Sequence, residues 1–149
     1  MAKTLNELYQ LAEQSDVDIY DFRLDYTKSI SLMESCGDCR IAIDSTQIKT
    51  SAEEKSILGH ELGHCVTGSF YNRCSPLDVR QKHENRANKR AALTLIPIDE
   101  LMDAMENPWC SLYYLAEHFE VTEEFLQKAL ELYRHEIEII MAGEEITQG

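Results

Sequence analysis

The feature that most constrains this chain is a pair of histidines in the segment His60-Glu61-Leu62-Gly63-His64. Residues four apart share one face of an α-helix, so the two imidazoles can point at a single metal ion. Two such nitrogens supply half of the tetrahedral ligand set that zinc prefers. Glu61 projects beside them, close enough to accept a proton from a water molecule that the metal activates. The segment therefore predicts a metal-binding helix whose uncharged neighbours allow it to be buried.

The sequence around the motif predicts where this helix begins and ends. Ser51 followed by Glu54 three residues later is a capping-box pattern, with Ser51 at the N-cap. The helix should end near Gly68. After the loop we expect a second helix that is capped by Asp78, runs to Ile96 and ends at Pro97.

This second helix offers a third ligand, because a catalytic zinc site has three protein ligands and one open position. Glu84 lies 20 residues after His64, and Ala87 and Ala91 on the same side let the two helices approach closely. The neighbouring His83 is the rival ligand, although it points about 100° away from that face. A solvated helix carboxylate is the alternative interpretation of Glu84.

Two further positions bear on the choice of ligands. One known arrangement has a third His six residues after the motif and a Gly three residues after it, but here those positions hold Phe70 and Thr67. That arrangement is excluded. Asn88, one turn after Glu84, can accept a hydrogen bond from the outer N–H of a ligand imidazole.

The remaining hydrophobic pattern predicts an α+β fold with a small sheet. We expect a core of residues 1–97 followed by a helical part, 98–149, packed on it. The expected helices are 3–14, 99–106, 111–119 and 122–141, and the expected strands are 17–24, 29–34 and 40–44, with a hairpin turn at 36–39.

Charge is distributed unevenly along the chain, whose formal net charge is −13. Residues 98–149 contain 13 acidic and two basic residues, a net of −11, which leaves −2 for residues 1–97. An acidic surface repels phosphate backbones and attracts basic proteins. We therefore predict no nucleic-acid binding, and we interpret the helix-turn-helix-like stretch 115–126 as helix packing.

The five cysteines are odd in number, and the N-terminus lacks the apolar core of a secretory signal. This combination favours reduced thiols, so we expect no structural disulfide and a cytoplasmic location. No apolar run approaches the roughly 18 residues that a membrane span requires. We also expect His118 and His135 to be surface residues.

Three segments together resemble the ImmA/IrrE family of metallopeptidases. They are the motif at 60–64, Glu84-Asn85-Arg86-Ala87-Asn88, and Ala91-Ala92-Leu93-Thr94-Leu95-Ile96-Pro97. The resemblance is strong over residues 40–97 and looser toward both ends. One departure is Asn88, where many relatives carry Asp, and an amide makes the ligand His less basic than a carboxylate would.

The resemblance implies a zincin-like core with one Zn²⁺ bound by His60, His64 and Glu84, and Glu61 as catalytic base. It also implies cleavage of helix-turn-helix repressors of phages or mobile elements. The alternative is a non-catalytic antirepressor or toxin-antitoxin-type binding module with structural zinc. Tyr71 and His83 flank the site in sequence and are candidate donors to the oxyanion. The strand at 40–44 is a candidate edge for an extended substrate peptide.

Overall fold

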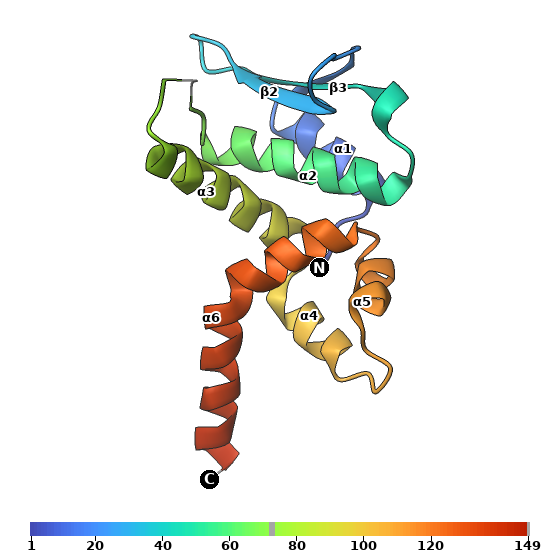
Figure 1. Cartoon of the computed structure of the whole chain (residues 1–149), viewed down its shortest axis with the longest axis vertical. Coiled ribbons are helices and arrows are strands. Elements are labelled where there is room, and N and C mark those ends of the chain that lie inside the picture. Colours follow the sequence, from blue (N-terminus) through green and yellow to red (C-terminus); the bar gives the residue numbers. More distant parts are fainter. Residues whose placement is uncertain (72–73, 149) are drawn as a thin grey trace.

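The computed structural model describes residues 1–71 and 74–148, and side chains to residue 143. Within these residues the chain forms six α-helices and a three-stranded sheet, so the fold is α+β (Figure 1). The elements are α1 (Leu5–Gln14), β1 (Asp18–Asp21), β2 (Ser29–Met33), β3 (Cys39–Ile43), α2 (Ser51–Thr67), α3 (Leu77–Leu95), α4 (Ile98–Met105), α5 (Leu112–Phe119) and α6 (Glu123–Gln148).

The sheet is mixed, with the strand order β1-β3-β2. β2 and β3 form the expected hairpin, in which Met33 pairs with Cys39 and Gly37 in the turn has a φ of +94°. β1 pairs in parallel with β3, with Ile19 opposite Ile41. β3 is therefore the central strand and has no free edge, so the expectation that 40–44 presents an edge to a substrate is wrong. The outer edge near α2 belongs to β2.

The motif helix α2 lies between the sheet and α3 (Figure 1). Its N-cap is Thr50 rather than Ser51, because the Thr50 hydroxyl accepts the Glu53 N–H at 3.1 Å. It ends as expected, since Gly68 takes the left-handed conformation at φ +65°. The predicted cap of α3 is also wrong: Pro76 is the N-cap and Asp78 lies in the first turn.

Small residues bring α2 and α3 together. Ala87 and Ala91 are fully buried on α3. A Cβ atom on Gly63 would lie 2.3 Å from the Ala87 carbonyl oxygen, and one on Gly59 would lie 2.6 Å from Leu95 Cδ1. The close approach that Ala87 and Ala91 suggested is therefore confirmed, and it positions α3 over the histidine face of α2.

One cluster of buried apolar side chains extends through the whole fold. It includes residues from the first helix to the last: Leu8, Ile41, Leu58, Leu95, Ile96, Leu101, Leu126 and Tyr133. Helices α4 to α6 thus bury part of the same core as the sheet and α2. The far half of α6 projects away from the rest of the molecule (Figure 1). None of the described helices is both long and apolar enough to cross a membrane.

The expectation that the chain has no structural disulfide is wrong. Cys39 at the start of β3 is bonded to Cys65 on α2, with 5.8 Å between their Cα atoms. Packing of the sheet on α2 brings the two residues within the separation that a disulfide requires. Neither the odd number of cysteines nor their spacing along the chain predicts this pairing. Cys36 and Cys110 are free thiols.

Candidate metal centre

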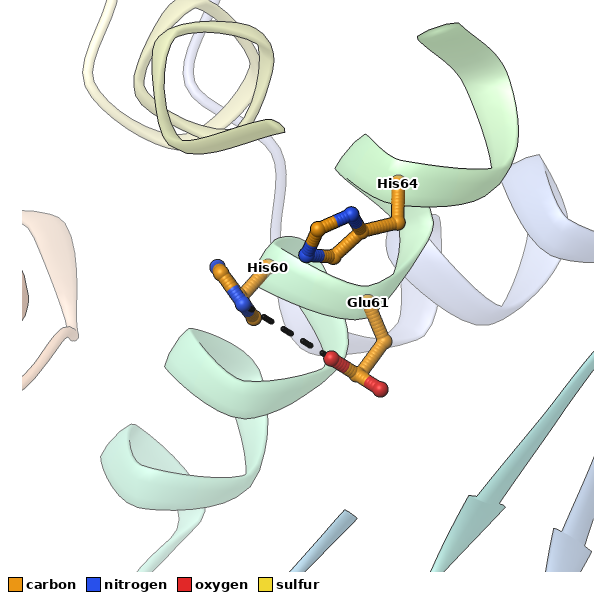
Figure 2. Close-up of side chains that lie close together, drawn as sticks. All are labelled: His60, Glu61 and His64. Carbon is orange, nitrogen blue, oxygen red and sulfur yellow. Dashed lines mark ion pairs between the residues drawn. The ribbon is translucent and has the colours of Figure 1, made fainter. Parts of the chain in front are cut away.

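Side-chain donors of His60, His64 and Glu84, from α2 and α3, lie close together. His60 Nε2 lies 3.4 Å from Glu84 Oε2, and His64 Nε2 lies 3.2 Å from Glu84 Oε1. The two imidazole rings are perpendicular, with centroids 4.8 Å apart. Figure 2 shows His60, Glu61 and His64 projecting from α2 toward the same side. The structure therefore brings together the three residues that the sequence suggested as ligands.

The two distances to Glu84 can be compared with those between the ligands of a tetrahedral zinc ion. Zinc binds imidazole nitrogen and carboxylate oxygen at about 2.0–2.2 Å. Ligands at that distance on the corners of a tetrahedron lie roughly 3.3 to 3.5 Å from one another. The distances of 3.4 and 3.2 Å from the two Glu84 oxygens to the two imidazole nitrogens are close to these values, so these donors fit a divalent ion.

The outer nitrogen of each imidazole has its own partner. His60 Nδ1 lies 2.7 Å from Asn88 Oδ1, as Asn88 led us to expect, and His64 Nδ1 lies 2.5 Å from the Ser69 carbonyl oxygen. Both acceptors require the proton on Nδ1, which leaves the lone pair of Nε2 for a metal. Ser69 was not among the residues predicted from the sequence. Gly68 was the available signal, because its left-handed turn directs the following carbonyl back to the helix end.

Glu61 has the environment of a proton-transfer group. Its side chain is buried, and Oε1 lies 3.7 Å from His60 Nε2. Burial raises the pKa of Glu61 to about 7, against the effect of the nearby His64. A carboxyl group with a pKa near neutrality can both accept and release a proton at physiological pH.

The candidate ligands Glu84 and His64 shift each other's pKa. The hydrogen bond with His64 lowers the pKa of Glu84 to about 2. Burial acts to lower the pKa of His64, but its bonds to Glu84 and to the Ser69 carbonyl outweigh burial and raise it. Burial lowers the pKa of His60. Glu84 is thus a carboxylate across the physiological range, the state in which it can bind a cation.

The two candidate oxyanion donors differ in position. The Tyr71 hydroxyl donates to Glu84 Oε1 at 2.8 Å, so it lies at the candidate metal centre. The His83 ring packs beside Tyr71, with centroids 6.3 Å apart, and its buried Nδ1 has no hydrogen-bond partner in the described part of the chain. The structure brings Tyr71 to the site and keeps His83 behind it.

Two cavities meet at this centre. One, of about 460 Å³, is bordered by β2, the residues after α2, and the face of His60, Glu61, His64 and Glu84. The other, of about 410 Å³, shares His60 and Glu84 and extends past Asn88 toward α6. The candidate ligands His60 and Glu84 therefore line two neighbouring cavities.

Comparison with known proteins identifies the family. The family model described as the IrrE N-terminal-like domain, of the M78 peptidases, matches residues 12–131. No curated protein and no solved structure matches the chain significantly. The matched range includes the whole candidate metal centre and most of the helical C-terminal part. The chain therefore belongs to the ImmA/IrrE family of peptidases, which the three segments at 60–64, 84–88 and 91–97 indicated.

Proposed function

We propose that this protein is a zinc-dependent endopeptidase, with one Zn²⁺ bound by His60, His64 and Glu84. The observation that carries the proposal is the spacing of 3.2 and 3.4 Å between the Glu84 carboxylate and the two Nε2 atoms. Family membership supports peptide hydrolysis as the reaction. A zincin-like core with a two-helix zinc site is part of the same proposal.

The reaction follows from what the side chains can do. Zinc supplies Lewis-acid chemistry there, since it polarises a carbonyl group and makes water more acidic. Glu61 accepts the proton of the attacking water and passes it to the leaving amine, a task for which a pKa of about 7 is suited. Tyr71 is the better-placed donor to the oxyanion, because its hydroxyl already reaches Glu84.

β2 provides the surface for an extended substrate peptide. Ser29, Ile30, Ser31 and Leu32 line the cavity that contains Glu61. β2 pairs with β3 on one side only, so its other edge can form backbone hydrogen bonds with a peptide. This assignment replaces the strand at 40–44.

We further propose a helix-turn-helix repressor of a phage or mobile element as the substrate, in the cytoplasm. The family resemblance supports this substrate, and so does charge. A DNA-binding repressor is basic, and residues 98–149 carry a net charge of −11.

The test compares the wild-type protein with Glu61→Gln, which keeps the size of the side chain and leaves the three ligands in place. Both proteins should bind one zinc ion per chain. The variant should cleave a library of peptides at a rate at least about 10²-fold lower than that of the wild type. Equal cleavage by both proteins would remove Glu61 from the mechanism. If the variant keeps full biological activity, the protein is instead a binding module with structural zinc.

A further inference from the structure

The cavity of about 410 Å³ beside His60 is not used by the mechanism above. It lies on the Asn88 side of the centre and shares His60 and Glu84 with the cavity along β2. A peptide bound along β2 over the proposed metal ligands can extend into this second cavity, because both cavities are lined by Ser29, His60 and Glu84. The second cavity is therefore in position to receive residues next to the cleaved bond.

The walls of this cavity come from parts of the chain that are far apart in sequence. α2 contributes Ser56 and Ile57, α3 contributes Asn88, and the start of β2 contributes Ser29. The opposite wall is the first turn of α6, with Phe125 and other side chains from the same helix. The acidic C-terminal part of the chain thus forms one side of the opening.

Two hydrogen bonds hold the connection between α5 and α6 against α2. The Thr122 N–H donates to Ser56 Oγ at 3.1 Å, and Lys55 Nζ donates to the Phe119 carbonyl oxygen at 2.6 Å. Ser56 is one helical turn before His60, so the start of α6 is fixed about one turn from a proposed ligand. Lys55 is buried, with 3% of its surface exposed. The cavity is therefore built from packed elements rather than from a loop.

The lining of this cavity combines apolar and charged side chains. Ile57 and Phe125 supply apolar surface within it. Lys28 and Lys128 line the cavity together with their ion-pair partners, Glu53 at 3.2 Å and Glu124 at 3.8 Å. The Lys128 pair is largely exposed, and such pairs contribute little stability, so Lys128 can exchange its partner for a substrate group.

We propose that this cavity is a specificity subsite of the peptidase. It binds a large apolar side chain of the substrate on one side of the cleaved bond, with Ile57 and Phe125 as its contacts. Lys128 favours an acidic residue beside that position. The inference rests on the proposed function, because it assigns the recognition of the peptide that the same centre would cleave.

The first test fills the cavity with Ile57→Trp and uses Leu93→Trp as its control. Leu93 is an exposed aliphatic residue of α3 that lines neither cavity. The zinc-loaded proteins are given a peptide library made from a digested, denatured protein mixture, and cleavage sites are read by mass spectrometry. The wild type and Leu93→Trp should favour a large apolar residue at one position, and Ile57→Trp should cleave those peptides at least about tenfold less efficiently.

The second test reverses a charge of the lining with Lys128→Glu and uses Arg134→Glu as its control. Both cations lie on α6 and pair with a glutamate four residues away, but Arg134 is outside the cavity. Lys128→Glu should shift the preference beside the cleaved bond from acidic toward basic residues, and Arg134→Glu should not. This variant also keeps the inference testable if Ile57→Trp fails to fold.

Three outcomes separate the two proposals. Altered preference in the cavity variants alone supports the subsite. Wild-type cleavage with the same preference in Lys128→Glu and in folded Ile57→Trp overturns the subsite and leaves the peptidase standing. No cleavage by zinc-loaded wild type overturns the proposed function, and the subsite with it.

Discussion

At the scale of single residues, Glu61 is a buried carboxyl group that the proposed reaction uses as its base. Its folded-state pKa of about 7 lies above the ordinary value of 4.5. The fold therefore favours the protonated form, and the ionised form is a source of instability in the metal-free protein. The effect of Glu61 ionisation on stability can be measured separately from catalysis.

The resulting prediction concerns stability against pH in the presence of a chelator. Because the pKa of Glu61 is raised, its favourable contribution is complete below about pH 4.5 and is lost as pH rises toward 7. Glu61→Gln, which cannot ionise, should match the wild type near pH 4 and be more stable at pH 8 by about 3 kcal/mol. Urea unfolding at both pH values measures the difference. An equal difference at the two pH values would contradict the raised pKa.

A second residue-scale prediction concerns Asn88. Loss of its acceptor should free the His60 ring and weaken zinc binding by about 10- to 100-fold in Asn88→Ala. Asn88→Asp keeps the acceptor and should retain the affinity. Asn85→Ala is the control, because Asn85 is exposed on the same helix and is paired with Gln81. Competition with a chromogenic chelator gives the constants; equal affinity in Asn88→Ala and Asn85→Ala would assign no role to the bond.

At the scale of elements, the placement of α3 over α2 depends on the absence of a side chain at Gly63. An alanine in a helix interior normally stabilises by about 0.5–1 kcal/mol relative to glycine. At Gly63 its Cβ would meet the backbone carbonyl of Ala87 at 2.3 Å, which only a shift of the helix can relieve. At Gly59 it would meet the end of the flexible Leu95 side chain.

We therefore predict that Gly63→Ala lowers the free energy of unfolding by about 1–3 kcal/mol and weakens zinc binding. Gly59→Ala should cost less and leave the affinity for zinc close to that of the wild type. Denaturant unfolding and zinc titration of both variants check the pair. A stabilised Gly63→Ala would mean that the helices do not approach as closely as described.

Much of the element pattern was predictable because it is local. Periodicity and terminal residues gave all six helices and the β2–β3 hairpin to within a few residues, apart from the C-terminal end of α6. The caps of α2 and α3 were each misplaced by one or two positions: Thr50 has a hydroxyl group like that of Ser51, and α3 begins at Pro76 without a side-chain cap bond. The parallel pairing of β1 with β3 and the Cys39–Cys65 bond depend on packing between distant segments. Spacing along the sequence does not encode them.

At the scale of the whole molecule, one core joins the sheet, the metal-site helices and the C-terminal helices. A boundary at residue 97 stays a prediction. The negative charge of residues 98–149 is a property of this larger unit, and it is expected to act on the rate of encounter with a basic substrate.

We predict that replacing exposed acids of α6, such as Glu131 and Glu138, with lysine slows cleavage of a basic protein substrate by roughly tenfold at low salt. The effect should shrink as ionic strength rises, because salt screens charges over about 10 Å at 0.1 M. Cleavage of a short neutral peptide serves as the control and should not change. The same rate for the basic substrate before and after the replacement would rule out electrostatic attraction by α6.

We propose that two imidazoles and one carboxylate from α2 and α3 bind the same ion. Zinc K-edge X-ray absorption of the protein with one equivalent of zinc measures these ligands. We expect nitrogen and oxygen ligands at about 2.0–2.2 Å, with imidazole scattering that is lost in a variant carrying both His60→Ala and His64→Ala. A sulfur ligand at about 2.3 Å, as the exposed group of Glu34, Cys36 and Asp38 would give, or a spectrum unchanged in that variant, would contradict it.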